Sequence, residues 1–241
     1  MTVAEGAELV ALAESSGLTL AIVHNFQFAR SVLTLDNWVA QGRLGALRGL
    51  WAMQLSNPRR RLPTWYDELP LGLFYDEAPH FFYLVRHLGG GDPKLTSATV
   101  IPTTRGEKNT PAQVTAQYEA PLPTTISMNF EAPLSEWHIA LFGDEGVGVV
   151  DIFRDIATFL PNDGRHETRA VIGTSIRGTL AHWIDHLRSG PNHLRGRLLY
   201  GNDEVYRRFG SAVRRGQQPD RISGRDGLAV LTAMHEILAV A

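Results

Sequence analysis

Apolar residues recur at helical spacing near both ends of the chain and form strand-like runs in its middle. The helical spacing predicts helices over Val3–Ser16, Ala29–Gln41 and Phe74–Leu88, and again near Ile176–Leu187, Asp203–Arg214 and Gly224–Val240. Short apolar runs separated by Pro, Gly and Asp predict strands over Leu47–Leu55, Leu95–Ile101, Gln113–Glu119, Thr124–Glu131, Glu136–Phe142 and Val147–Phe153. Because most of these strands follow one another without helices between them, we predict an α+β fold with an open, mainly antiparallel sheet and helices on one face.

The first strand-like run has a different character from the others. Leu18–Val23 is almost continuously apolar, which is typical of a strand covered on both faces in a parallel sheet. The predicted helix before it ends at Gly17, as a helix with a glycine cap does. We therefore interpret this opening helix and strand as one αβ unit of a parallel sheet whose other strands are not in the sequence.

Composition and charge exclude several classes of function. The 241 residues include 23 basic and 25 acidic side chains, so no strong field favours nucleic acid or an anionic membrane. The chain contains no cysteine, which excludes disulfides, thiolate nucleophiles and cysteine-based zinc sites and agrees with a reducing cytoplasm. It has no apolar run of about 18 residues and no signal peptide, so we expect a cytoplasmic protein.

Four segments, in order along the chain, resemble the Gfo/Idh/MocA family of oxidoreductases. They are AELVALAESSGLTLAIVHNFQF at residues 7–28, GRLGALRGLWAM at 42–53, GLFYDEAPHFFYLVRHLGG at 72–90 and SGRDGLAVLTAMHEILA at 223–239. The first is similar to the last helix and strand of the family's dinucleotide-binding domain, and the others are similar to parts of its C-terminal domain. The resemblance implies a remnant of the dinucleotide-binding domain over residues 1–28 and a C-terminal α+β domain over residues 29–241.

The sequence also departs from the family pattern. Relatives have a G-x-G-x-x-G turn that holds the cofactor's pyrophosphate, and no such turn occurs here. Gly146-Val-Gly148 lies among predicted strands, and we interpret it as a hairpin turn. The family's catalytic lysine precedes the opening helix, and the two lysines of this chain, Lys94 and Lys108, lie beyond the catalytic helix. We therefore expect no bound cofactor and no redox chemistry by this polypeptide alone.

The candidate catalytic residues are Asp76 and His80. Their spacing of four places both on one face of the predicted helix, and Tyr83 continues that face. In relatives, the resemblance implies that the matching histidine acts on the substrate's hydroxyl proton and that the matching aspartate orients it. A carboxylate beside His80 is expected to raise its pKa and fix its tautomer. Tyr83 stands where the family has an acidic residue, which favours a more apolar ligand.

Further side chains are candidates for binding the substrate. Aromatic residues surround the catalytic helix in the sequence, and two polar residues end the predicted strand Leu18–Val23, where sites of α/β proteins lie. The substrate-binding candidates are Tyr83, Trp65, Tyr66, Tyr75, Asn25 and His24. Arg59-Arg-Arg61 either forms a solvated loop or holds an anionic group at the pocket. His182 and His186 share a helix face, but no third ligand is evident, so we predict no metal site.

Three functions remain open from the sequence. The first is a non-redox enzyme that uses the old substrate pocket for acid–base or templated chemistry, such as isomerisation, elimination or cyclisation of a small, fairly apolar metabolite. The second is the substrate-domain subunit of a split NAD(P)-dependent oxidoreductase, with a separate Rossmann-domain subunit. The third is a catalytically silent binding or scaffold protein. Because relatives associate through the free face of the sheet, we also expect a homodimer or homotetramer, without nucleic acid or membrane as partners.

Overall fold

The computed structural model describes residues 1–62, 64–105, 109–119, 121–198 and 200–240. Its α-helices are α1 (Val3–Ser15), α2 (Arg30–Ala40), α3 (Leu73–Glu77), α4 (Pro79–Gly89), α5 (Thr168–Leu194), α6 (Asn202–Arg215) and α7 (Gly224–Leu238). Its strands are β1 (Leu47–Leu55), β2 (Leu95–Ile101), β3 (Gln113–Tyr118), β4 (Thr124–Asn129), β5 (Glu136–Gly143), β6 (Gly146–Asp151) and β7 (Ile156–Pro161), and short 3-10 helices cover Phe26–Phe28 and Trp65–Glu68.

The seven strands form one open sheet in the order β2-β3-β4-β1-β5-β6-β7. All neighbouring pairs are antiparallel except β1 and β4, which run parallel from Leu50–Thr124 to Leu55–Asn129. This sheet confirms the predicted α+β fold and its mainly antiparallel character. The strand β7 and the parallel pairing of β1 were not predicted.

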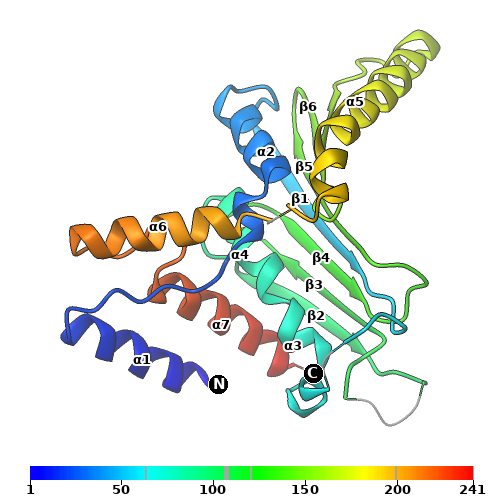
Figure 1. Ribbon diagram of the computed structural model, residues 1–241. Helices are drawn as coiled ribbons and strands as arrows, with labels where there is room; N and C mark the ends of the chain where they lie inside the picture. The colour runs from blue at the N-terminus through cyan, green and yellow to red at the C-terminus, as the bar shows by residue number, and fades with distance from the viewer. Residues whose placement is uncertain (63, 106–108, 120, 199, 241) are drawn as a thin grey trace.

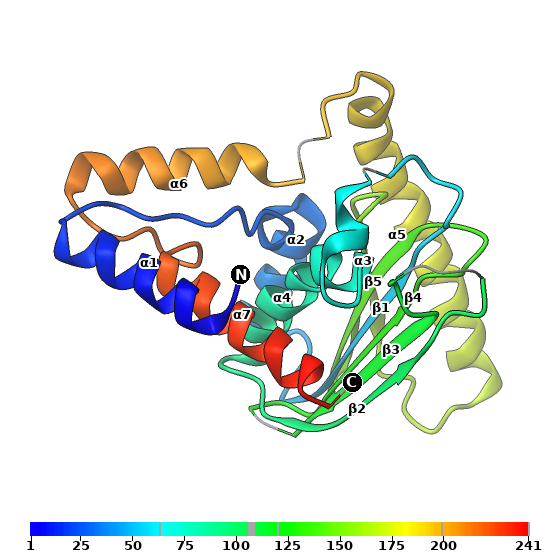
Figure 2. The same cartoon turned by 90° about the horizontal axis from the view of Figure 1, so that it is seen from below.

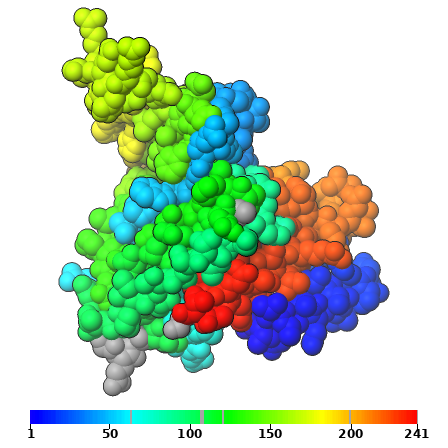
Figure 3. Space-filling model, turned by 180° about the vertical axis from the view of Figure 1, so that it is seen from behind, coloured from blue at the N-terminus to red at the C-terminus, as the bar shows by residue number. Residues whose placement is uncertain are grey.

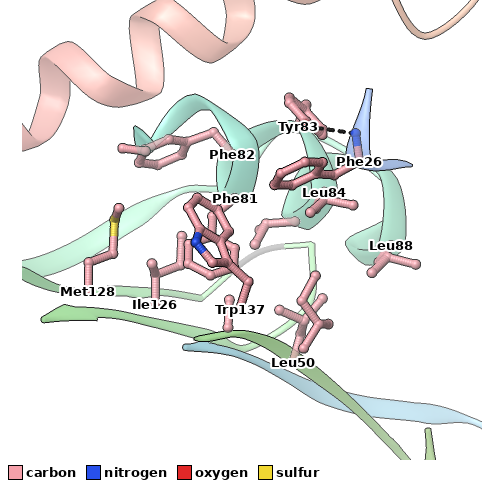
Figure 4. Packing of buried hydrophobic residues seen from close by; sticks show 14 of the residues in the cluster. Phe26, Leu50, Phe81, Phe82, Tyr83, Leu84, Leu88, Ile126, Met128 and Trp137 are labelled. Atoms are coloured by element: carbon pink, nitrogen blue, oxygen red, sulfur yellow. Dashed lines mark hydrogen bonds between the residues drawn. The ribbon is translucent and has the colours of Figure 1, made fainter. Parts of the chain in front are cut away.

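Most helices lie on one face of the sheet, which we call the inner face (Figure 1, Figure 2). There α4 packs over β1 and β4, and α2 packs over β6 and β7. The fully buried core between α4 and the sheet includes Phe81, Leu50, Ile139 and Met128. In Figure 4, Trp137 lies between Phe81 and Leu50. Burying large apolar side chains of this kind contributes roughly 1.5–3 kcal/mol each.

The helix α5 departs from the predicted one-sided arrangement. It packs on β7, the edge strand of the sheet, and its Asp185 pairs with Arg30 of α2. Its Gly178 lies so close to Leu160 that an added Cβ would stand 3.0 Å from the leucine side chain. The N-terminal half of α5 projects from the body of the molecule (Figure 1, Figure 3).

The predicted strand Leu18–Val23 is not formed. Residues 18–23 are extended, but within the described residues their only ladder contact is a single bridge between Ala21 and Ser223. The end residues of the segment are exposed, Leu18 by 63% and Val23 by 53%. A strand requires a neighbouring strand with which its backbone forms successive hydrogen bonds. Beyond the bridge to Ser223 the segment has no such neighbour among the described residues, so its apolar residues do not form a strand. The helix before it, α1, was predicted correctly and packs on α7 (Figure 3).

Two other predictions of local structure were wrong. The helix predicted over Phe74–Leu88 is divided into α3 and α4, because Pro79 lacks the N–H that would continue α3 and instead occupies the first turn of α4. Gly146 and Gly148 lie inside strand β6, and the hairpin turn is formed by residues 144–145. An added Cβ on Gly148 would stand 2.3 Å from Leu35 of α2, so close packing of α2 on β6 explains this glycine.

None of the helices in the described part of the chain is both long and apolar enough to cross a bilayer. The predicted division into residues 1–28 and 29–241 stays a prediction. In the structure α1 is attached to the rest of the molecule through α7, and the side chain of Arg225 pairs with Glu14.

Candidate functional site

Five side chains from two segments form a compact cluster, which we call the His80 cluster. His24, Asn25 and Phe26 follow the extended segment 18–23, and His80 and Tyr83 come from α4. The Tyr83 hydroxyl oxygen lies 2.7 Å from His80 Nδ1 and accepts the backbone N–H of Phe26 at 3.0 Å. The same hydroxyl lies 3.5 Å from Asn25 Oδ1. The structure thus brings together four of the eight candidate residues.

Helix geometry explains how α4 contributes to this cluster. Residues three apart lie on the same side of a helix, so His80 and Tyr83 both face the segment 24–26. The 3-10 turn Phe26–Phe28 buries its aromatic side chains and presents the Phe26 N–H toward Tyr83 (Figure 4). Ring stacking completes the contact, with centroids 4.5 Å apart for His24 and Tyr83 and 4.3 Å apart for Phe26 and His80.

Aromatic side chains that were not predicted as site residues surround the His80 cluster. Trp137 of β5 meets His80 edge to face at 5.5 Å and Phe26 at 5.5 Å. Tyr200 lies 5.8 Å from Phe26. The alternating pattern of the predicted strand indicates that Trp137 faces the core. It does not indicate that Trp137 lies beside His80, because the two residues are far apart in the sequence.

Burial keeps the cluster electrically neutral. Burial, together with a smaller effect of the positive form of His24, lowers the pKa of His80 to about 4. Burial also lowers the pKa of His24 to about 4, although Asp226 opposes this shift. The pKa of Tyr83 is raised well above its usual value by burial. At neutral pH all three groups are therefore uncharged.

The hydrogen bonds allow two proton arrangements. In one, Tyr83 donates to His80 Nδ1, so Nε2 carries the ring proton and acts as a donor. In the other, Nδ1 donates to the Tyr83 oxygen, the tyrosine donates to Asn25 Oδ1, and Nε2 is a free acceptor. No described residue hydrogen-bonds Nε2 of His80, which is only half-buried. Nε2 of His80 therefore keeps a hydrogen-bonding capacity that a ligand can use.

Asp76 does not orient His80 as expected. The two residues lie in different helices, and the hydrogen-bond partner of His80 in the described structure is Tyr83. The electrostatic partner of Asp76 is Arg60, whose charge opposes the rise in the pKa of Asp76 that burial causes. Arg60 also pairs with the buried Glu77, so the middle of the arginine run reaches into the protein rather than into solvent. The prediction that a carboxylate raises the pKa of His80 was therefore wrong.

The remaining aromatic candidates lie apart from the cluster. Trp65 is 51% exposed, and Tyr66 is buried at a cavity of about 80 Å³ that Leu73 and Thr110 also line. Tyr75 donates a hydrogen bond to the backbone oxygen of Met1 at 2.7 Å.

Two cavities adjoin His24. An apolar cavity of about 250 Å³ lies between α1 and α7 and is lined by His24, Tyr75, Pro79 and leucine, valine and isoleucine side chains. A cavity of about 240 Å³ on the other side is lined by His24, Tyr83 and the charged groups of Arg86, Arg221 and Asp226. His24 thus separates an apolar space from a charged one, beside the His80 cluster.

Three side chains of the kinds that bind metal ions lie close together at a place that was not predicted from the sequence. Glu136 and His138 of β5 and Asp151 of β6 bring their ligand atoms within 4.8 Å of one another. The guanidinium of Arg154 pairs with both carboxylates, at 2.5 Å from Asp151, and holds the pKa of Glu136 below its usual range. The positive charge of Arg154 therefore offsets the negative charge of the two carboxylates.

The two histidines that share a face of α5 also lie close together. The rings of His182 and His186 stack in parallel, with their centroids 6.4 Å apart.

The two lysines do not join the site. Lys94 pairs with Glu119 at 2.5 Å on the surface, and Lys108 lies outside the described residues.

The comparisons with known proteins agree with this architecture. A family model described as the GFO/IDH/MocA C-terminal domain matches residues 32–148. No curated protein matches the chain in a sequence search. An oxidoreductase domain protein from Kribbella flavida superposes with a TM-score of 0.70 at 18% identity, over 99% of this chain and 68% of its own.

Other similar structures are dehydrogenases. A levoglucosan dehydrogenase in complex with NADH and levoglucosan superposes with a TM-score of 0.69 at 16% identity, over 99% of this chain and 69% of its own. A UDP-N-acetylglucosamine 3-dehydrogenase from Acidithiobacillus ferrooxidans superposes with a TM-score of 0.67 at 14% identity, over 100% of this chain and 67% of its own. At these identities the likeness establishes the fold. The family match identifies residues 32–148 as belonging to the C-terminal domain of the GFO/IDH/MocA family.

Proposed function

We propose that this chain is an enzyme in which His80 transfers a proton to or from a small, fairly apolar molecule. The observation that supports the proposal is the hydrogen bond between Tyr83 and His80 Nδ1, which fixes the ring and leaves Nε2 available. A histidine with a pKa of about 4 is unprotonated at neutral pH, so His80 begins the reaction as a proton acceptor.

The proton then moves through the pair. When Nε2 accepts a proton from a substrate C–H or O–H bond, the ring becomes positively charged. Its other N–H, at Nδ1, donates to the Tyr83 oxygen, and the Tyr83 hydroxyl donates in turn to Asn25 Oδ1. Return of this proton to a different substrate atom gives isomerisation, and its transfer to a leaving group gives elimination. Both outcomes leave the substrate's oxidation level unchanged, so neither needs a nicotinamide.

The residues present do not fit a dinucleotide by themselves. The sequence has no G-x-G-x-x-G turn, and the two glycines closest to that pattern, Gly146 and Gly148, lie in strand β6. An added Cβ on Gly146 would stand 2.6 Å from a backbone oxygen of β7, so sheet packing occupies the space beside it.

Hydrogen exchange tests the proposal without knowledge of the natural substrate. The protein is incubated in D₂O with a panel of small, fairly apolar ketones and hydroxy ketones, and deuterium entry at carbon is followed by NMR. We expect exchange with the wild type, a loss of about 10²–10⁴-fold with His80→Gln, and no change with His166→Gln, an exposed histidine on a distant loop. Exchange that persists in His80→Gln would contradict the role of His80.

A second candidate is the substrate domain of a split oxidoreductase. It is supported by exposed apolar side chains on α1 and the segment after it, Leu9, Leu12, Leu18 and Val23, which a dinucleotide-binding chain could cover. The test is to add a Rossmann-domain protein encoded beside this gene and follow NADH fluorescence. NADH binding by the mixture, together with no deuterium exchange by the chain alone, would favour this candidate. Cytoplasmic localisation and the formation of a homodimer or homotetramer also remain proposals.

A further inference from the structure

The long helix α5 carries its apolar residues on the side that faces away from the protein. Ile172, Ile176, Leu180, Trp183 and Leu187 follow one another at spacings of four, four, three and four residues, and we call them the α5 stripe. These five side chains are between 54% and 70% exposed. Residues at this spacing share one face of a helix, so the stripe is continuous along about four turns.

The opposite side of α5 is the side attached to the body. Gly178 packs on Leu160 of β7, and the buried Asp185 accepts hydrogen bonds from Arg30 at 2.8 Å and from the Ala157 N–H at 2.8 Å. Ser189 on this side is also buried. Small and polar groups therefore fix α5 to its own chain, and the stripe is left without a partner among the described residues.

The size of the stripe is appropriate for a protein interface. With Ile184 beside it, the exposed parts of the six side chains make up on the order of 700 Å², more than the largest apolar patch of a typical monomer. A standard interface buries about 800 Å² on each partner. Steps of three and four residues between apolar side chains are typical of helices that pack side by side, as in coiled coils.

We propose that the α5 stripe binds the α5 stripe of a second copy of this chain, with the two helices antiparallel about a two-fold axis near Leu180. A two-fold interface uses the same patch on both copies, and an apolar stripe satisfies this requirement because it is complementary to itself. Antiparallel packing also opposes the two helix dipoles and places the two bodies at opposite ends.

A membrane surface fits the stripe less well. Helices that lie on anionic membranes carry many Lys and Arg residues on their polar face. The corresponding face of α5 is formed by Gly178, Asp185 and Ser189, which pack on the body. Arg177 and Arg188 lie on one flank of the stripe, and Arg169 continues its line at the N-terminal end of the helix. The formal net charge of the chain is −2, which does not favour an anionic surface.

Sedimentation of three variants tests the proposal. We expect the wild type at 10 μM to sediment as a dimer, at twice its 26.6 kDa, and Ile176→Glu/Leu187→Glu to sediment as a monomer with unchanged helix content. The matched control Ser175→Glu/His182→Glu adds the same charges to the same helix outside the stripe and should stay dimeric. Trp51→Glu on the outer sheet face should also stay dimeric.

Other outcomes would overturn the proposal. They are a monomeric wild type, a stripe variant that remains dimeric, and a dimer that only Trp51→Glu dissociates. A monomeric wild type that co-sediments with phosphatidylserine vesicles would assign the stripe to membranes instead.

Cysteine crosslinking tests the arrangement directly, because the chain has no cysteine of its own. In the antiparallel pair, Leu180→Cys lies beside its copy and should form a disulfide dimer under mild oxidation. Ile172→Cys should not, because the two copies of this position stand on the order of 20 Å apart. Crosslinks at both positions would indicate parallel helices, and a dimer with crosslinks at neither would show that the stripes do not meet. Either result would overturn the proposed arrangement.

Discussion

Acid should destabilise the protein through His24, and the substitution His24→Phe should remove that sensitivity. The pKa of His24 falls from 6.5 to about 4 because the ring is buried, with 3% of the residue exposed. Below pH 6.5 the unfolded chain therefore binds a proton that the folded chain resists, and stability falls as the pH is lowered from 6.5 to 4. The pKa difference of about 2.5 corresponds to about 3.4 kcal/mol in total, of which about 2 kcal/mol is lost by pH 5.

Phenylalanine is a suitable replacement because it retains the stacking of this ring on Tyr83. Among the described residues the Nδ1 atom of buried His24 has no hydrogen-bond partner, so its removal breaks no hydrogen bond that the structure shows for that atom. We expect His24→Phe to be as stable as the wild type at pH 7.5, or about 1 kcal/mol more stable.

Urea unfolding at pH 7.5, 6, 5 and 4.5 measures the effect. The free energy of unfolding of His24→Phe should fall less steeply below pH 6.5 than that of the wild type, by about 2 kcal/mol at pH 5. The control His182→Asn changes an exposed histidine of α5 and should keep the wild-type slope. Equal slopes for the wild type and His24→Phe would refute the reasoning, because the acid sensitivity would then arise elsewhere.

Three further predictions follow from buried contacts and from the glycine pattern. Tyr83→Phe leaves the Phe26 N–H without its acceptor and His80 without its partner, so the free energy of unfolding should fall by about 1–3 kcal/mol in a urea titration. Arg30→Met leaves the buried carboxylate of Asp185 without its bidentate cation and should cost about 3 kcal/mol by the same measurement, whereas Arg30→Lys should cost less. Calorimetric titration of this chain with NADH or NADPH should show no micromolar binding, and clear binding would contradict our interpretation of the missing glycine turn.

The sheet was predictable because its strands alternate apolar and polar residues between strong turn signals. The strand β7 was missed because Ile156–Pro161 ends in a proline and precedes a loop rather than another strand, so no hairpin pattern marks it. The strand expected at Leu18–Val23 failed for the opposite reason. Its residues favour a strand, but pairing depends on neighbours that the sequence of the segment does not reveal.

The candidate site was only partly predictable for a similar reason. Helical spacing correctly placed His80 and Tyr83 on one face, and it misled for Asp76 because Pro79 begins a new helix between the two predicted catalytic residues. The direction of the pKa shift of His80 depends on burial by Phe26 and Trp137, which approach from distant parts of the chain. No pattern along α4 itself contains that information.

The place of β1 in the sheet has a consequence for how the chain folds. In the sequence β4 and β5 are neighbours, but in space β1 lies between them, parallel to one and antiparallel to the other. During synthesis β1 emerges first, yet both of its pairing edges exist only after Glu136–Gly143 has been made. The meanders β2–β4 and β5–β7 can form from local contacts, whereas insertion of β1 requires closure of a long loop and should limit the folding rate. Until that step, Trp51 and Met53 remain on an unpaired strand, so aggregation during refolding should depend strongly on protein concentration.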